Sequence, residues 1–123
     1  NPETLIIGNG DVVTVADAHA KIVSSGVDGA MLGRSIFGNP WLFHPDKDLS
    51  NVSIPERLRV MVEHTKLFEE LLHFKNFATM KKHYKAYVNG FAEAAQLRAT
   101  LMEQNTASEI ETVVHSFLQK TSL

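Results

Sequence analysis

Cysteine is absent from the sequence. The chain can therefore form no disulfide, no thiolate metal site and no cysteine nucleophile. No apolar run approaches the ~18–20 residues that cross a bilayer, and the first residues, NPETLIIGNGDVV, lack the pattern of a secretory signal. Proline and glycine are few, at 4 and 7 of 123 residues, which excludes collagen-like and low-complexity classes. We expect an ordinary folded cytoplasmic chain that does not associate with membranes.

The chain has no excess of positive charge, because 12 basic residues stand against 14 acidic ones and the formal net charge is −2 with histidine neutral. Residues 76–98 are an exception, since they contain one acidic residue, Glu93, and four basic ones. The basic residues are Lys81, Lys82, Lys85 and Arg98. The chain is no general polycation, but this segment could meet an anionic partner.

The first 44 residues begin with a strand signal and a helix signal. Residues 4–7 form a short apolar run rich in β-formers, and the glycines of residues 8–11 end it as a turn. Thr14 is a predicted N-cap for a helix over 15–24, and Gly26 is its predicted stop.

The strand signal then returns. Residues 27–32 predict a second strand, which Gly33-Arg34 ends, and a short helical turn is expected over 35–37. Strand, loop and helix thus alternate twice, which is typical of parallel α/β folds. We expect residues 1–44 to form one domain of this kind.

The remainder shows only helix signals. Residues 45–54 are polar and predict a linker to an all-α domain over 55–123. Apolar residues there recur with the 3.6-residue period of amphipathic helices. The predicted helices cover 55–73, 75–89, 92–104 and 107–120. Four short helices with short connections predict a small four-helix bundle.

Two glycine loops, each directly after a predicted strand, carry the chemistry. Asn9, Gly10 and Asp11 follow the first strand, where backbone N–H groups can close on a phosphate. Gly33 and Arg34 follow the second, and the guanidinium can bind phosphate oxygens through two N–H groups. Either loop alone is more typical of an ordinary glycine turn with a solvated arginine. The pair, in the order found near the end of (β/α)8 barrels, favours a phosphate site.

The sequence resembles the C-terminal part of bacterial-type tRNA-dihydrouridine synthases from about Thr4 to Phe117. The matching motifs are GNGDV, GVDGAMLGRSIFGNPWLF and the helical KKHYKAYVNG with a later LR. Other flavin barrels share the GNG and GR loops, so GNPWLF and the helical motif are the more specific parts. The resemblance implies the last two βα units of a (β/α)8 barrel that binds FMN. It also implies that NADPH reduces the FMN, and that the reduced FMN in turn reduces the C5–C6 double bond of uridine in tRNA.

The same resemblance implies two sets of site residues. The FMN phosphate contacts fall on Asn9, Gly10, Asp11, Gly33 and Arg34. The RNA contacts fall on Lys82, His83, Tyr87 and Arg98, flanked by Lys81 and Lys85. Taken as residues alone, Tyr87 fits a core position with a bonded hydroxyl equally well, His83 fits helix packing equally well, and Lys81 and Lys85 are more typical of a solvated flank. The histidine spacing gives no pattern of metal ligands.

Two features of the family are missing from these residues. Only two of eight barrel units are present, and the family's catalytic cysteine and flavin-side lysine have no counterpart. We therefore expect a C-terminal fragment that is inactive alone. Two alternatives stay open: a stand-alone helical RNA-binding module, and a different FMN barrel that oxidises or reduces a small molecule.

Overall fold

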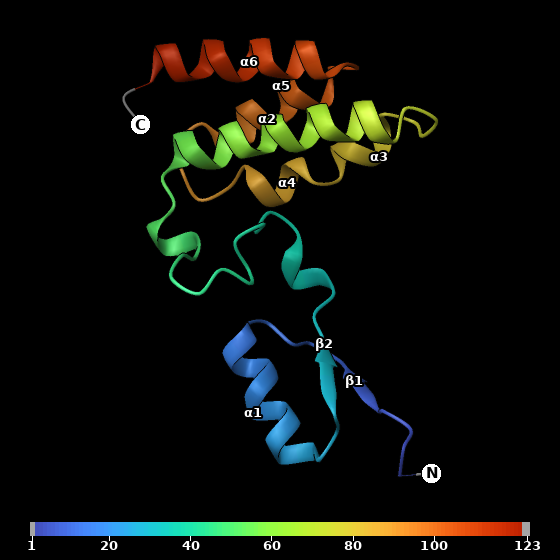
Figure 1. Ribbon diagram of the computed structural model, residues 1–123. Coiled ribbons are helices and arrows are strands. Elements are labelled where there is room, and N and C mark those ends of the chain that lie inside the picture. The colour runs from blue at the N-terminus through green and yellow to red at the C-terminus, as the bar shows by residue number, and fades with distance from the viewer. Residues whose placement is uncertain (1, 122–123) are drawn as a thin grey trace. The chain divides into compact units, whose positions relative to one another are not determined.

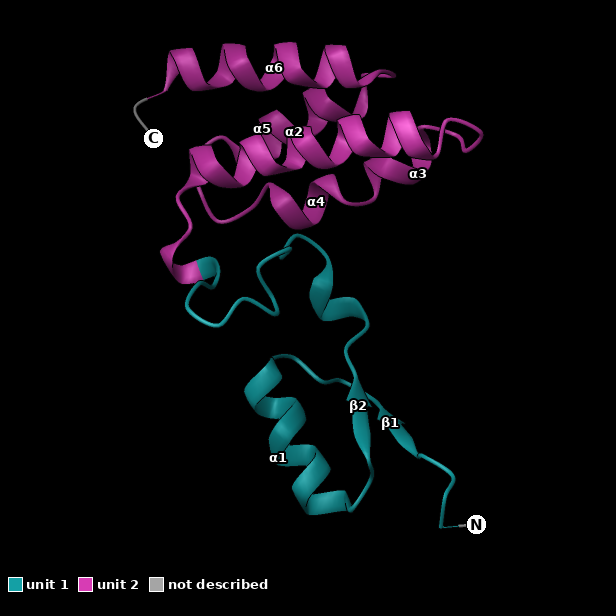
Figure 2. Cartoon of the chain, in the orientation of Figure 1, with its two compact units in different colours: residues 1–49 teal, residues 50–123 magenta. Residues whose placement is uncertain are grey.

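The computed structural model describes residues 2–121. It divides into two compact units, Asn1–Leu49 and Ser50–Leu123, which Figure 2 colours teal and magenta. Within the described residues, the first unit holds a two-stranded sheet and the second is helical (Figure 1). None of the helices in residues 2–121 combines the length and the apolar character that a membrane span requires.

The sheet of the first unit is parallel. Strand β1 (Ile7–Asn9) pairs with β2 (Gly29–Met31), and helix α1 (Val15–Ser25) connects them. The Thr14 hydroxyl accepts from the Asp17 N–H, and Gly26 ends the helix at φ 76°, so both predicted caps of this helix are confirmed. The order strand, helix, strand predicted from the sequence is therefore confirmed.

Both strands are shorter than predicted, and β1 begins later than expected. The Asp28 carboxylate accepts from the Ile6 N–H at 2.8 Å, and the Asp28 N–H donates to the Ile6 carbonyl at 2.9 Å. The Asp28 side chain thus satisfies the Ile6 N–H, and the regular ladder of backbone hydrogen bonds starts at Ile7. It continues through Gly8 to Asn9, two residues beyond the apolar run, so the turn begins at Gly10.

Two short 3₁₀ turns follow β2. The first is η1 (Arg34–Ile36), which begins one residue before the helical turn predicted over 35–37. The second is η2 (Leu49–Asn51). Because η1 starts directly after Gly33, the Arg34 side chain leaves the chain at the carboxyl end of β2.

The second unit is built from five helices within the described residues. They are α2 (Ile54–Leu71), α3 (Ala78–Lys81), α4 (Tyr84–Tyr87), α5 (Ala94–Met102) and α6 (Ala107–Lys120). The side chains that they bury completely include Leu58, Met61, Met80, Tyr84, Leu101 and Ile110. Helix α2 packs along α6, and α5 lies against both α4 and α6 (Figure 1).

The single helix predicted over 75–89 is wrong, because the chain forms α3 and α4 around Lys82 and His83 instead. The His83 N–H donates to the Met80 carbonyl and the Ala86 N–H to the His83 carbonyl, which are three-residue turns. Both tyrosine hydroxyls of α4 reach partners on α2, since Tyr84 bonds with Thr65 and Tyr87 with His64. The predicted four helices are therefore five.

The longer helices begin at side-chain caps. The Ser53 hydroxyl accepts from the Glu56 N–H at the start of α2, and the Thr106 hydroxyl accepts from the Glu109 N–H at the start of α6. Each such cap stabilises a helix by about 1 kcal/mol. Glu69 of α2 adds a second contact to α6, since its carboxylate accepts from the Ala107 N–H at 2.8 Å.

Candidate functional sites: an anion recess and a cationic recess

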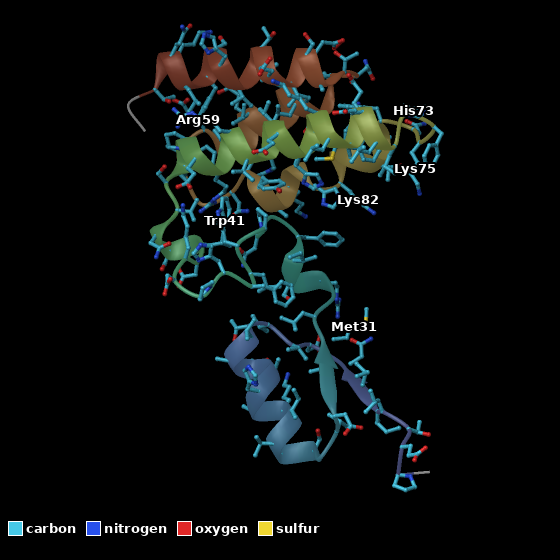
Figure 3. The ribbon with its side chains drawn as sticks, in the orientation of Figure 1. Met31, Trp41, Arg59, His73, Lys75 and Lys82 are labelled. Carbon is cyan, nitrogen blue, oxygen red and sulfur yellow. The ribbon has the colours of Figure 1, made fainter. Side chains whose placement is uncertain are left out.

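A recess of about 680 Å³ lies at the carboxyl ends of β1 and β2. We call it the anion recess. Its lining consists of Asn9, Gly10, Asp11, Val12, Val13, Met31, Gly33, Arg34 and Ser35. Met31, labelled in Figure 3, is the last residue of β2. All five residues predicted to contact phosphate therefore line one recess in the structure.

Arg34 is paired within this recess. Its guanidinium donates to the Asp11 carboxylate at 3.0 Å, and the two side chains are 88% and 85% exposed. An ion pair this exposed contributes between zero and about 1 kcal/mol, so it gives way readily to a stronger anion. A guanidinium also has five N–H donors. Arg34 can therefore hold Asp11 and donate to a second anion.

Backbone conformation is unusual where the first loop lines the recess. Gly10 has φ 143° and Asp11 has φ 50°, a region that residues other than glycine adopt rarely. Lys21 of α1 donates to the Asp11 carbonyl at 2.9 Å, and the Asp17 carboxylate accepts from the Val13 N–H at 3.1 Å. That hydrogen bond, together with Lys21, lowers the pKa of Asp17. Helix α1 therefore fixes the loop conformation.

Ser35 is a recess residue that sequence reasoning missed. Its hydroxyl oxygen is buried and has no hydrogen-bond partner among residues 2–121. Buried polar atoms without partners are uncommon, and an anion in the recess would supply an acceptor. The signal was present in the sequence, since a hydroxyl residue directly follows Gly33-Arg34. With two glycines, one arginine and this hydroxyl, the recess fits a phosphate group.

A second recess, of about 590 Å³, lies on the helical unit, and we call it the cationic recess. Helices α3 to α5 and the residues between α3 and α4 supply its lining. The lining residues are Lys81, Lys82, Tyr84, Lys85, Ala95, Arg98, Ala99 and Met102. Four of the six predicted RNA contacts are therefore brought together, and none of the residues that line the recess is acidic. Such a surface attracts anions.

Two of these four cations also hold the fold. The Lys81 ammonium donates to the Met102 carbonyl at 2.9 Å, at the end of α5. The Arg98 guanidinium donates to the Val88 carbonyl at 2.7 Å, just after α4. Lys82 and Lys85 are exposed. Removing the exposed Lys85 therefore changes the recess charge with less structural cost than removing Arg98.

His83 and Tyr87 lie outside the cationic recess. Tyr87 is 2% exposed, and its hydroxyl lies 3.0 Å from Nδ1 of His64. Burial raises the Tyr87 pKa to about 12. This burial places Tyr87 in the core of the helical unit, which is the alternative that the sequence left open beside a nucleotide contact.

His83 stands beside His64, with the ring centroids 4.9 Å apart. Burial lowers the pKa of both histidines, and the charges of His64 and Lys82 lower that of His83 further. A neutral His83 can still donate one hydrogen bond to a phosphate. The predicted RNA contact of His83 is therefore separate from the lysines of the cationic recess.

A family model described as dihydrouridine synthase matches residues 1–122. The chain belongs to the dihydrouridine synthase family. Three relatives carry the name "Probable tRNA-dihydrouridine synthase". The Staphylococcus epidermidis protein is 33% identical over 121 residues, covering 94% of this chain and 36% of the relative. The Staphylococcus aureus MRSA252 protein is 30% identical over 118 residues, covering 94% and 35%. The Mycobacterium leprae protein is 29% identical over 123 residues, covering 89% and 31%.

This dihydrouridine synthase chain spans about a third of the length of the curated relatives that it matches. The resemblance seen in the sequence is thereby confirmed at the level of the family. Within residues 2–121, no group of three or more His, Asp or Glu side chains is arranged to hold a metal ion.

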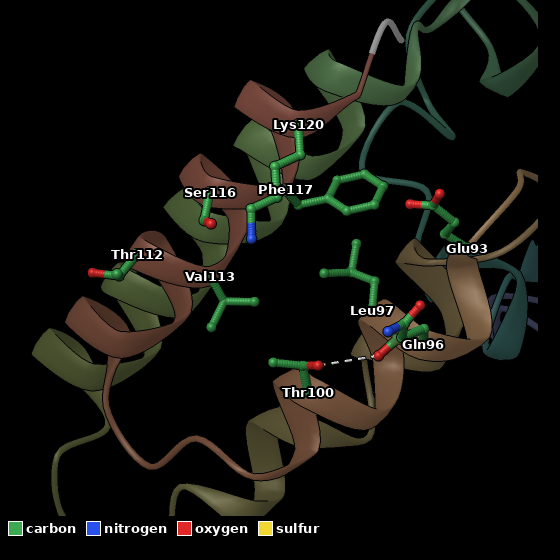
Figure 4. Close-up of a pocket in the computed structure, with 9 residues that line it drawn as sticks. All are labelled: Glu93, Gln96, Leu97, Thr100, Thr112, Val113, Ser116, Phe117 and Lys120. Atoms are coloured by element: carbon green, nitrogen blue, oxygen red, sulfur yellow. Dashed lines mark hydrogen bonds between the residues drawn. The ribbon is translucent and has the colours of Figure 1, made fainter.

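The dihydrouridine synthase chain has a third recess, of about 390 Å³, between α5 and α6. Figure 4 shows Leu97, Val113 and Phe117 converging on it, with the Thr100 hydroxyl bonded to the Gln96 carbonyl at 3.2 Å. Its lining contains one acid and one base, Glu93 and Lys120. It has neither the glycine loops of the anion recess nor the four cations of the cationic recess, so nothing in its lining favours an anion.

Proposed function

We propose that this chain supplies the phosphate end of an FMN site and an RNA-binding helical surface to a cytoplasmic tRNA-dihydrouridine synthase. The observation that carries the proposal is the anion recess, where Arg34, two glycines and the unpartnered Ser35 hydroxyl meet beyond two parallel strands. Phosphate sites of (β/α)8 barrels lie at this end of the strands. We propose accordingly that residues 1–44 form the last two βα units of such a barrel.

Each recess residue has a defined task in this proposal. The glycine loops bring backbone N–H groups close to the phosphate, Arg34 neutralises its charge, and Ser35 donates a hydrogen bond. Asn9 adds an amide donor, and Asp11 orients the Arg34 guanidinium. When bound, FMN reduced by NADPH supplies the hydride for uridine reduction. The proton donor lies outside these residues, since they include no cysteine.

We propose that the cationic recess holds the phosphate backbone of tRNA. The positive charge comes from Lys82, Lys85 and Arg98. Lys81 adds to it from the edge of the recess, and His83 donates a hydrogen bond from beside the recess. Structured RNA is recognised largely through shape and backbone. The surface is therefore expected to add affinity with little base specificity.

The FMN proposal is tested on the full-length enzyme that contains these residues. Arg34→Ala should weaken FMN binding about 10- to 100-fold, because a hydrogen bond to a charged group contributes about 1.5–3 kcal/mol. Quenching of flavin fluorescence measures the affinity. Arg59→Ala removes another exposed guanidinium, from α2, and should leave the affinity unchanged. Unchanged affinity in Arg34→Ala would contradict the proposed site.

The RNA proposal is tested by salt dependence. Replacing Lys82 and Lys85 with glutamine should flatten the log–log slope of tRNA affinity against salt by about 1–2, since each phosphate contact contributes roughly 0.7–0.9. Lys120→Gln removes one positive charge at the α5–α6 recess and should have no effect. Wild-type affinity and slope in the double variant would show that Lys82 and Lys85 are solvated charges. NADPH oxidation without RNA should stay normal in both variants.

A further inference from the structure

Lys21 of α1 stands behind the anion recess and contacts the loop that lines it. Its ammonium donates to the Asp11 carbonyl at 2.9 Å and lies 3.3 Å from the Asp17 carboxylate. The same carboxylate oxygen accepts from the Val13 N–H at 3.1 Å. Lys21 and Asp17, one helical turn apart, therefore tie both ends of the segment 11–13 to α1.

The residue held in this way is the strained one. Asp11 has φ 50°, a left-handed conformation that residues other than glycine adopt uncommonly. The Lys21 bond is made to the main chain of Asp11, so it constrains the backbone and not the carboxylate. Loss of that bond leaves Asp11 free to relax toward an ordinary conformation, which would turn its side chain elsewhere.

The Asp11 side chain continues the connection to the other loop. Its carboxylate accepts from Arg34 at 3.0 Å, although both side chains are more than four-fifths exposed. An exposed pair between two mobile side chains has little orienting effect. Here one partner stands on an anchored backbone, so Arg34 has a defined place to rest beside the recess.

We propose that Lys21 is a positioning residue for phosphate binding, acting through Asp11 on Arg34. This inference rests on the proposed FMN site and deepens it. The ammonium fixes the strained loop, the loop places the carboxylate, and the carboxylate orients the guanidinium before the phosphate arrives. Groups that are already in place lose less freedom on binding, and affinity rises accordingly.

The test uses FMN affinity of the full-length enzyme, measured by flavin fluorescence. Lys21→Met, which keeps the length of the side chain, should weaken binding about 3- to 10-fold. Lys21→Arg should recover most of the loss, because a guanidinium can still donate to the Asp11 carbonyl. Lys47→Met removes the same charge from a lysine that lies over the Trp41 ring, and should leave FMN affinity unchanged.

A second measurement separates positioning from simple loop damage. In an Arg34→Ala background, Lys21→Met should weaken FMN binding less than twofold further, because the residue through which Lys21 acts is already gone. Full additivity of the two losses overturns the route through Arg34. Amide exchange of residues 10–13 in the FMN-free enzyme should be faster in Lys21→Met than in the wild type, and unchanged exchange overturns the anchoring step.

The outcomes also distinguish this inference from the proposed function. Wild-type affinity in Lys21→Met together with weak binding in Arg34→Ala overturns the role of Lys21 and leaves the FMN site standing. Wild-type affinity in both variants overturns the site itself. If Lys21→Met does not fold, the Lys21→Arg and Lys21→Gln variants replace it, and normal affinity in Lys21→Gln overturns the inference.

Discussion

Gly10 and Asp11 are two consecutive residues of the anion recess with positive φ. A Cβ on Gly10 would meet nothing within 4 Å, so space around the residue does not exclude a side chain. The conformation does, because φ 143° is rarely adopted by an L-residue. A substitution at Gly10 therefore acts by changing the path of the loop.

Gly10→Val should weaken FMN binding in the full-length enzyme at least tenfold while leaving the protein folded. Backbone strain of this kind amounts to about 1–3 kcal/mol, which the loop relieves by moving away from the phosphate position. Gly26→Val is the matched control, since Gly26 has φ 76°, open space around it and a place at the other end of α1. It should lower the melting temperature without changing FMN affinity. Normal binding in Gly10→Val would make the loop an ordinary turn.

His64 and His83 form a titratable pair beside Tyr87. Both have pKa values below the ordinary 6.5, because burial disfavours their charged forms. The unfolded chain therefore binds protons first as the pH falls. Stability is full above about pH 6.5 and is lost as the pH falls through the lower pKa values of the folded state.

We expect the urea concentration at the unfolding midpoint of the 123-residue chain to decrease as the pH is lowered from 7.5 to 5.5. The slope is at most about 1.4 kcal/mol per pH unit for each proton taken up. Replacing His64 and His83 with glutamine should reduce that slope, whereas replacing the exposed His115 should not. If the double variant keeps the same pH dependence, other titratable groups cause it.

At the scale of elements, α2 and α6 are joined by more than apolar packing. The Glu69 carboxylate accepts from the Ala107 N–H in the first turn of α6, where an anion also meets the positive end of the helix dipole. The contact is available only because α6 begins where α2 passes.

Glu69→Ala should lower the free energy of unfolding by about 1–2 kcal/mol, as expected for a charge-assisted hydrogen bond. Glu70→Ala is the matched control, because Glu70 is the next residue of the same helix and is exposed. It should change stability by less than about 0.5 kcal/mol. Chemical unfolding curves measure both, and equal effects of the two variants would contradict the role of Glu69.

Local chemistry made most helix boundaries of this chain predictable. Thr14, Gly26 and Thr106 act on their own backbone neighbours, so their signals could be read without the fold. The division at Lys82 and His83 could not be read in this way. It depends on hydroxyl partners from α2, which lies about 20 residues earlier in the sequence. Periodicity reports which residues face the core, but not which hydrogen bonds the core offers.

The residues of the candidate sites likewise divide into those that the sequence could predict and those that it could not. The glycine loops and Arg34 were predictable because the residue types themselves suit a phosphate. Lys21 was not predictable, since it acts through a main-chain carbonyl. Ser35 had a signal in its place after Gly33-Arg34, but the burial of its unpartnered hydroxyl could be seen only in the structure. The excess of basic residues over 76–98 indicated the cluster of four cations in one recess. That Tyr87 is not part of this surface could be seen only from its burial in the structure.

At the scale of the whole molecule, the two units differ in how much apolar surface they bury. The buried apolar residues of the first unit are Val12 and Ala18, whereas the core of the second contains a cluster of twelve. Large apolar side chains of the first unit remain exposed, including Leu5, Ile7 and Val23. The free energy that protects the backbone should therefore be distributed unequally along the chain.

Amide exchange of the 123-residue chain should be faster in β1, α1 and β2 than in α2 and α6. Opening of the first unit exposes little additional apolar surface, so its free energy is small. Mass spectrometry of peptic fragments measures the exchange, and α5 serves as an internal reference within the helical unit. Equal or greater protection of the strands would show that the first unit has a stability of its own.

The distribution of aromatic residues gives the chain two separate optical reporters. Its single tryptophan, Trp41, belongs to the first unit, while its two tyrosines, Tyr84 and Tyr87, lie in the core of the second. Burial raises the pKa of both phenols to about 12, so they stay un-ionised in ordinary buffers. Indole emission thus follows one unit, and the near-ultraviolet tyrosine signal follows the other. Their melting can be recorded separately in one unlabelled sample.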